Sequence, residues 1–320
     1  DMARAAGMAR LAALVDSERV LALADNEEWS DAFALQNAAP PASVAAQPAV
    51  HAARLEAFAV LSLRAGNPVA AERSATEAEA LRIAAQDFAG SARATALLAE
   101  AQLAGGDVAT ARETAARAVK AAVRAGRIDI EVTAELTGLM AAARAAVPAP
   151  ERIATARDVL IRADVAGSVP QRIAVRDLLA AALNERGDSK AALQVARDAV
   201  ALATEHPLLR WRGRAHSRLA ASLLASGDAD AALAETEVAA RLGVQAEDRV
   251  TQARALLIGG RALVAQGPLD EAQLALGHAM QVAFALRLPG LAGEAAFAQG
   301  DVFLRLKRAR EARHVFEQAV

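Results

Sequence analysis

The feature that most constrains this sequence is a set of small residues that return at fixed places in a repeat of about 40 residues. A Gly-Asp pair or a close variant marks a turn at five places: Gly66-Asn67, Gly106-Asp107, Gly187-Asp188, Gly227-Asp228 and Gly267-Pro268. An alanine follows each turn, and extending the spacing gives eight: Ala32, Ala71, Ala111, Ala154, Ala192, Ala232, Ala272 and Ala312. Seven residues later come Ala39, Ala78, Ala118, Ala199, Ala239, Ala279 and Ala319, with Ile161 as the exception. Since seven residues make about two helical turns, the two columns share one helix face.

A third column of small residues lies twelve positions before the first alanine of each unit. Its members are Ala59, Ala99, Ala142, Ala180, Ala220, Gly260 and Gly300, with Val20 as the misfit. Small side chains let two helix backbones approach to the short end of about 8–10 Å. Each unit is therefore predicted to be a helix, a tight turn and a second helix, and the sequence predicts an all-α chain of about eight such hairpins.

Composition supports helices and excludes several classes of protein. Hydrophobic residues make up 54% of the chain, while aromatic residues make up only 3%, which argues against a β-sandwich or barrel. Cysteine is absent, so a disulfide scaffold, a thiol nucleophile and a cysteine-ligated zinc are excluded. The net charge of −2 argues against a basic nucleic-acid binder, and no apolar run reaches the 18 or so residues of a membrane span.

The pattern resembles the tetratricopeptide repeat (TPR), whose unit has a small residue in its first helix, a Gly-Asp-like turn and two alanines in its second. The resemblance covers residues 1–320 and implies a right-handed α-α superhelix, a single TPR-like solenoid in which the first helices line a concave groove. The units are longer than the usual 34 residues, and leucine and alanine replace most of the usual aromatic residues. In these respects they are similar to the repeats of bacterial regulators of the maltose-regulon-activator type. Lysine occurs only at Lys120, Lys190 and Lys307, and this preference for arginine, together with the abundant alanine, indicates a bacterial origin.

Two segments interrupt the regular pattern. Residues 38–48 contain Pro40, Pro41 and Pro48 and are expected to form an extended connector, because proline is excluded from helix interiors. The fourth turn, residues 147–152, has the sequence VPAPER instead of a Gly-Asp pair. It is interpreted either as a seam between two parts of the solenoid or as an ordinary turn of different sequence.

Catalytic and metal-binding signals are weak. The sequence has no glycine-rich dinucleotide or phosphate loop, no G-x-S-x-G and no H-E-x-x-H. The five histidines, His51, His206, His216, His278 and His314, are scattered, and no two of them have the i, i+4 spacing of a metal pair. We therefore expect no catalytic residues, no metal site, no cofactor and no enzymatic activity.

The groove implied by the resemblance supplies the candidate binding residues. The repeat register places Glu56, Arg93, Glu100, Asp177, Asn184, Arg214, Ser217, Arg254, Arg261, Phe297, Asp301 and Arg305 on its exposed surface. Arg214 and Arg254 occupy equivalent places in adjacent units, and Arg261 lies two turns beyond Arg254. Arginine binds carboxylates and phosphates bidentately, so this stretch suits an acidic ligand. The alternative is a solvated face whose arginines are paired locally. A second basic cluster, residues 208–218, surrounds Trp211, which is interpreted as a core residue rather than a nucleic-acid contact.

These observations predict a non-catalytic module that binds a protein or peptide, with an acidic partner as one candidate. We expect it to be the sensor or scaffold segment of a larger, cytoplasmic bacterial regulatory protein with a role in signalling or transcription regulation. Two alternatives remain: a self-assembling structural solenoid and the partner-binding arm of a repeat-associated protease. Neither a membrane nor a nucleic acid is expected as a partner of this segment.

Overall fold

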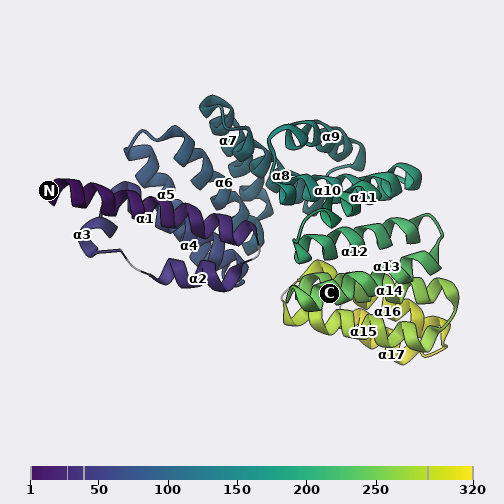
Figure 1. Ribbon diagram of the computed structural model, residues 1–320. Coiled ribbons are helices and arrows are strands. Elements are labelled where there is room, and N and C mark those ends of the chain that lie inside the picture. The colour runs from purple at the N-terminus through teal and green to yellow at the C-terminus, as the bar shows by residue number, and fades with distance from the viewer. Residues whose placement is uncertain (1, 27, 39, 287, 319–320) are drawn as a thin grey trace. The chain divides into compact units, whose positions relative to one another are not determined.

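The computed structural model describes residues 2–26, 28–38, 40–286 and 288–318, and within them every regular element is an α-helix (Figure 1). The chain divides into two compact units, Asp1–Val175 and Arg176–Val320. The first unit contains α1 (Met2–Asp25), α2 (Trp29–Asn37), α3 (Ala42–Ala45), α4 (Pro48–Arg64), α5 (Pro68–Ala84), α6 (Phe88–Gly105), α7 (Val108–Ala125), α8 (Ile128–Arg144) and α9 (Ala149–Ala166). The boundary between the units lies inside α10 (Val169–Arg186).

The second unit continues the same order of paired helices. Beyond α10 it contains α11 (Ser189–Thr204), α12 (Leu209–Ala225), α13 (Ala229–Gln245), α14 (Arg249–Gln266), α15 (Leu269–Ala285), α16 (Pro289–Arg305) and α17 (Ala309–Gln318). With the short α3 set aside, the described helices form eight hairpins, as the sequence predicts. In each hairpin we call the first member the A helix and the second the B helix. The expected all-α, TPR-like helical-repeat solenoid is confirmed.

Within each unit, most helices pack against their neighbours in sequence. In unit 1, α4 also contacts α6, and α6 contacts α8; in unit 2, α12 contacts α14, and α14 contacts α16. All four of these additional contacts join the A helices of consecutive hairpins. The helices α4, α6 and α8 of unit 1 and α12, α14 and α16 of unit 2 therefore each form a layer, and polar side chains of successive hairpins can meet on its surface.

The turns inside the hairpins follow the predicted Gly-Asp chemistry. At the turn between α6 and α7, Gly106 has a φ of +94°, a left-handed conformation that glycine adopts without steric cost. The side chain of Asp107 then accepts a hydrogen bond from the backbone N–H of Thr110 at 3.1 Å and caps α7. Asp188 and Asp228 cap α11 and α13 in the same way.

The predicted alanine columns are buried where the B helices pack. In seven hairpins the first alanine of the column is the fourth residue of its B helix, and each one is at most 1% exposed: Ala32, Ala71, Ala111, Ala192, Ala232, Ala272 and Ala312. Of the second column, Ala78, Ala118, Ala199, Ala239 and Ala279 are buried as well. Ala39 and Ala319 lie outside the described residues.

The fourth hairpin departs from the predicted register. Ala154 and Ile161 are exposed, while Arg152 and Val159 occupy the corresponding buried positions. The physical reason is the turn: α9 begins at Ala149, so its fourth residue is Arg152. The buried Arg152 donates from Nε to the carbonyl oxygen of Val147 at 2.8 Å and so satisfies a polar group at a place where the other hairpins have alanine. Residues 147–152 thus form a helix start, and a seam at this point remains a prediction.

The expectation of an extended connector is wrong for part of residues 38–48. Residues 42–45 form the single turn α3, whose Val44 is 4% exposed and packs with Ala13 and Val50. Pro41 immediately precedes α3, and Pro48 begins α4. Proline is accepted at helix starts because no N–H donor is needed there. Burial of Val44 therefore allows a short helix between the two prolines.

Of the helices that the structure describes, none combines the length and the apolar character that a membrane crossing requires.

Candidate functional site

In unit 1, two of the residues predicted to line the A-helix surface meet in an ion-pair network. Arg93 on α6 contacts Glu18 on α1 at 2.7 Å and Glu56 on α4 at 3.8 Å. Glu56 is only 1% exposed and also accepts a hydrogen bond of 2.8 Å from Nε of Arg82. Burial raises the pKa of Glu56, and the hydrogen bond and charge of Arg82 and the charge of Arg93 offset only part of this effect. Glu56 is thus an internal partner and not the exposed residue that the sequence predicted. Glu100 is half-buried.

In unit 2, the A helices bring together a larger group of charges, which we call the arginine cluster. It consists of six residues, five from α10, α12 and α14 and one that immediately precedes α14: Asp177, Arg210, Arg214, Arg218, Arg254 and Asp248. Arg218 holds Asp177 through two hydrogen bonds, of 2.7 Å from Nε and 3.4 Å from an Nη atom. Burial acts to raise the pKa of Asp177, because it disfavours the charged carboxylate. The charge and hydrogen bonds of Arg218, and then the charges of Arg254 and Arg214, outweigh this effect and keep the pKa below its ordinary value.

Asp248, the residue that caps α14, is the other acid of the cluster. One of its oxygens, Oδ2, accepts from Nε of Arg210 at 3.2 Å, from Nε of Arg214 at 3.4 Å and from the hydroxyl of Thr251 at 2.9 Å. The other oxygen accepts from the backbone N–H groups of Val250 and Thr251. Burial acts to raise the pKa of Asp248, but the charges of Arg214 and Arg210 and the hydrogen bonds from Thr251 together hold it below its ordinary value. The carboxylate is 2% exposed, and its protein partners already occupy both of its oxygens.

Arg214 lies at the centre of this arrangement. Its guanidinium carbon is 4.8 Å from the centre of the Trp211 ring, within the range of a cation–π contact. Burial, together with repulsion from Arg210 and Arg254, lowers the pKa of Arg214 to about 10, although Asp248 and Asp177 act in the opposite direction. Because this pKa lies well above 7, the guanidinium group stays charged at neutral pH.

The remaining predicted residues of unit 2 have separate environments. Arg261 pairs with Glu294 at 3.2 Å, and Arg305 pairs with Asp301 on its own helix at 2.9 Å. Asn184 donates a hydrogen bond of 3.1 Å to the hydroxyl of Ser222. Phe297 is exposed, and its ring centre lies 5.2 Å from that of Phe316 on α17.

The prediction that Ser217 lies on the exposed surface is wrong. It is 4% exposed and therefore buried, whereas the repeat register placed it in the open groove. The helix that carries it, α12, packs against α11, α13 and α14. Neighbours on several sides leave an A helix only a narrow exposed stripe, and Ser217 lies outside this stripe.

Sequence reasoning missed three members of the cluster as site residues: Arg210, Arg218 and Asp248. The basic stretch 208–218 contains no acid, and the acidic partners of Arg210 and Arg218 come instead from neighbouring hairpins. Arg210 and Asp248 are 38 positions apart, and Arg218 and Asp177 are 41 apart. Both separations are close to one repeat, so an ion-pair search at the repeat spacing could have found these partners.

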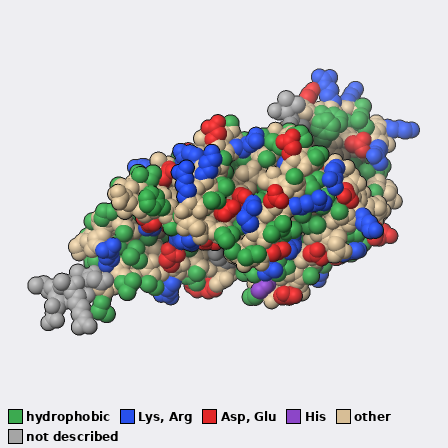
Figure 2. Space-filling model, turned by 90° about the horizontal axis from the view of Figure 1, so that it is seen from above, with side chains coloured by type: hydrophobic (Ala, Val, Ile, Leu, Met, Phe, Trp, Pro, Cys, Tyr) green, Lys and Arg blue, Asp and Glu red, His purple; other side chains and the backbone are tan. Residues whose placement is uncertain are grey.

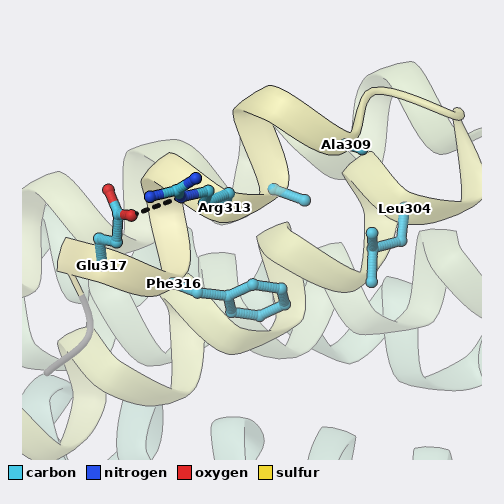
Figure 3. Close-up of a pocket in the computed structure, with 6 residues that line it drawn as sticks. Leu304, Ala309, Arg313, Phe316 and Glu317 are labelled. Carbon is cyan, nitrogen blue, oxygen red and sulfur yellow. Dashed lines mark hydrogen bonds and ion pairs between the residues drawn. The ribbon is translucent and has the colours of Figure 1, made fainter.

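A shallow pocket of about 380 Å³ lies between α16 and α17 (Figure 3). Six residues line it: Leu304, Ala309, Ala312, Arg313, Phe316 and Glu317. Arg313 and Glu317 join each other at 2.7 Å along α17, while Phe316 and Leu304 supply an apolar wall. The two charged lining residues are thus paired with each other, and the rest of the lining is apolar.

Two of the described histidines lie within hydrogen-bonding distance of a glutamate on another helix. His51 lies 3.0 Å from Glu77, and His216 lies 2.6 Å from Glu235. Among the residues that the structure describes, no group of three or more His, Asp or Glu side chains could hold a metal ion. Figure 2 shows basic and acidic side chains interspersed among apolar ones on the face that it presents, in keeping with the near-balanced charge.

Comparison with known proteins places the fold among helical-repeat proteins. No protein-family model and no curated protein matches the sequence. Among solved structures, a Rap protein complexed with competence and sporulation factor is similar over 97% of both chains, with 13% identity and a TM-score of 0.74. The Rap conjugation gene regulator of plasmid pLS20, in complex with the Phr* peptide, has 14% identity and a TM-score of 0.66; the match covers 85% of this chain and 73% of that one.

A third similar structure is a signal transduction ATPase with numerous domains (STAND) that has a tetratricopeptide repeat sensor, from Pyrococcus horikoshii. Its identity is 13% and its TM-score is 0.57, and the match covers 84% of this chain and 41% of that one. These likenesses establish the TPR-like helical-repeat fold of the chain.

Proposed function

We propose that this chain is a non-catalytic module that binds a peptide or an extended segment of a protein on the A-helix surface of unit 2. The observation that carries the proposal is the arginine cluster, in which charged side chains of three successive A helices meet. The cations there are guanidinium groups, which stay protonated at neutral pH and so are suited to holding a ligand rather than to moving a proton.

The comparisons support the same reading. The Rap protein complexed with competence and sporulation factor and the Rap regulator with the Phr* peptide share the helical-repeat fold and carry bound ligands. By analogy, we propose that a peptide is the ligand here. Such a peptide would lie along several hairpins and use the layer that α12, α14 and α16 form.

We further propose that the chain acts as the sensor or scaffold segment of a larger bacterial regulatory protein in the cytoplasm. The STAND protein with a tetratricopeptide repeat sensor is a structural precedent for this organisation. The long, alanine-rich units favour a regulator of the maltose-regulon-activator type within this class. Flanking coding sequence for a nucleotide-binding or DNA-binding domain would support this assignment, and flanking sequence for a protease domain would contradict it.

Selection from a random peptide library tests the binding function. The folded chain is the target, and two double variants of matched charge are compared with it. The site variant is Arg254→Glu with Arg261→Glu, both exposed on α14; the control is Arg197→Glu with Arg241→Glu, both exposed on B helices. We expect enriched peptides to bind the chain and the control but not the site variant. If no peptide distinguishes the site variant from the control, this binding surface is wrong.

A further inference from the structure

The first and the last of the described hairpins each expose an apolar surface. On α1, Leu11 is 63% and Val15 is 48% exposed, and the two residues lie four positions apart on one helix face. On α16, Phe297 is 69% and Leu304 is 51% exposed, and they lie seven positions apart on one face. Neighbouring apolar side chains with this exposure are typical of an interaction surface.

The repeat shows what covers the position of Phe297 in the other hairpins. Phe297 lies three residues before Gly300, a member of the third column of small residues. At the same place, six of the seven earlier A helices have a residue that is at most 4% exposed: Ser17, Glu56, Ala96, Leu139, Ser217 and Leu257. Each of these helices is followed by another hairpin. The exposed position of Phe297 is therefore one against which an A helix packs elsewhere in the chain.

The buried cluster between the seventh and eighth hairpins shows this packing in detail. Leu257 on α14 and Leu276 on α15 form one side of it. The other side comes from α16, which contributes Ala295 and Val302, with the partly buried Leu291 beside them. Each such cluster thus has a receiving side, from one hairpin, and an inserting side, from the A helix of the next.

The last hairpin repeats the receiving side. Phe297 and Phe316 stand 40 positions after Leu257 and Leu276, and their ring centres are 5.2 Å apart. Leu304 extends the surface along α16 and lines the shallow pocket together with Phe316 (Figure 3). We call Phe297, Leu304 and Phe316 the receiving surface. Its residue types and positions match those that hold an A helix one hairpin earlier.

The first hairpin repeats the inserting side. The third column aligns Val20 of α1 with Gly300 of α16. In this alignment, the three positions that α16 contributes to the buried cluster correspond in α1 to Leu11, Val15 and Ala22, which are all exposed. We call these three residues the inserting surface. The position of Val15 is at most 2% exposed in five later A helices, at Ala94, Thr137, Ala215, Ala255 and Ala295.

The charges around the two surfaces are opposite in sign. Residues 1–37, which contain the first hairpin, have seven acidic and three basic side chains. The last hairpin, residues 289–318, has five basic and four acidic side chains, and all five basic ones lie in 305–318 with only two of the acids. Contact between the first and last hairpins brings opposite charges together, whereas contact between two first hairpins brings like charges together.

We propose that the inserting surface of one copy of this chain packs on the receiving surface of a second copy. In this contact, α1 of one copy takes the place against α16 and α17 that α16 itself takes against α14 and α15. Because the two surfaces differ, each contact leaves one surface of each kind free, and copies add in series as an open chain or a ring. The inference goes beyond the proposed peptide binding and does not depend on it.

The test is the mass of the chain in solution, measured by analytical ultracentrifugation over a wide range of protein concentrations. Two double variants each block one surface. Leu11→Glu with Val15→Glu blocks the inserting surface, and Phe297→Glu with Leu304→Glu blocks the receiving surface. All four side chains are exposed, so the fold should tolerate the changes, and circular dichroism verifies that both variants remain helical.

The matched control is Ile161→Glu with Val165→Glu on α9, which replaces two exposed apolar residues outside both surfaces. The mean mass of the control and of the unaltered chain should rise with concentration to at least twice the mass of one chain. Each blocked variant alone should keep the mass of one chain. An equimolar mixture of the two blocked variants should form a complex of one copy of each, because one intact surface remains on each partner.

Three results would overturn the proposal. The first is an unaltered chain that stays monomeric at every concentration, which would leave these surfaces to helices of other proteins. The second is self-association that survives in both blocked variants, which would place the contact elsewhere on the molecule. The third is self-association that only one of the two blocked variants loses, which would show that two identical surfaces meet.

Discussion

At the residue scale, the smallest side chains set the distances between helices. Gly260 on α14 faces α15 so closely that an added Cβ would lie 2.6 Å from Cγ of Leu276, a side chain with no exposed surface. Its neighbour Gly259 faces the preceding hairpin instead, where a Cβ would lie 3.2 Å from the hydroxyl of Thr236. The tight packing on both sides accounts for two adjacent glycines inside a helix, where each costs about 1 kcal/mol relative to alanine.

Substituting two glycines by alanine should therefore have opposite effects on stability. Gly260→Ala would overpack the core, at a cost of about 1–3 kcal/mol, against a gain of about 1 kcal/mol in helix propensity. Gly290 lies in the first turn of α16 with no atom near its Cβ position, so Gly290→Ala should stabilise by about 0.5 kcal/mol. Urea unfolding of both variants measures the difference, and equal stability of the two would contradict this packing.

The limits of prediction from sequence are also visible at single residues. The burial of Ala111 and Ala118 follows from spacing alone, because both lie on the packed face of one helix. The burial of Ser217 and Glu56 does not, since it depends on how many neighbours surround an A helix. The pairing of Arg210 with Asp248 depends on the distance between hairpins. A pattern within one hairpin therefore predicts its core, whereas the surface chemistry requires the stacking of several hairpins.

At the scale of elements, each helix is positioned by its first turn. Among the described residues, five hairpin turns have glycine in the left-handed conformation, and in four of them an Asn or Asp caps the next helix. The fourth hairpin shows the consequence of a different turn. Its second helix, α9, starts at Ala149, and this start determines which residues are buried, so the predicted Ala154 is not at the buried position. The sequence predicted the existence and order of the helices, and the error in register arose where the turn chemistry changed.

Two aspartates at helix starts should differ in their effect on stability. Asp228 is exposed and caps α13 only, so Asp228→Ala should cost about 1 kcal/mol. Asp248 is buried, caps α14 and holds two arginines, so Asp248→Ala should cost about 3 kcal/mol or more, because the arginines lose their partner. Thermal or urea unfolding compares the two variants. A smaller loss for Asp248→Ala would show that the cluster contributes little to stability.

The aspartates of the arginine cluster also predict a pH dependence for unit 2. The pKa values of Asp177 and Asp248 lie below the ordinary 3.8 in the folded chain, so between the folded and ordinary values the unfolded chain binds more protons. Their stabilisation is complete above pH 3.8 and is lost as the pH falls through the lower, folded values. Trp211 fluorescence in a Trp29→Phe background follows the unfolding of unit 2. The double variant Asp177→Asn, Asp248→Asn should lose less stability on acidification, and an unchanged acid response would contradict the assignment.

At the scale of the whole molecule, the contacts are local. Within each unit, most helices pack on their sequence neighbours, and A helices such as α4, α6, α12 and α14 also pack on the A helix of the next hairpin. Stability in such an array is close to a sum of hairpin and nearest-neighbour contributions. The proposed binding site, by contrast, draws on several hairpins at once, since the arginine cluster combines residues of α10, α12 and α14 with Asp248.

Local packing predicts a local response to destabilisation. In Gly260→Ala, amide hydrogen exchange should accelerate in α14 and α15 and in the adjacent α13 and α16. Exchange in α4 to α7 of unit 1 should remain as in the unaltered chain. Mass spectrometry of proteolytic fragments gives the exchange of each helix. A uniform acceleration across both units would show that the chain unfolds as one cooperative body.

The central claim is that a peptide binds on the A-helix surface of unit 2, and photo-crosslinking tests it most directly. The best library peptide, made with a diazirine side chain, is irradiated in complex with the chain, and mass spectrometry locates the crosslinks. The account predicts crosslinks in α12 and α14 and in the second half of α10, with protection by the unlabelled peptide. Crosslinks confined to α11, α13 and α15, or to the pocket between α16 and α17, would contradict it.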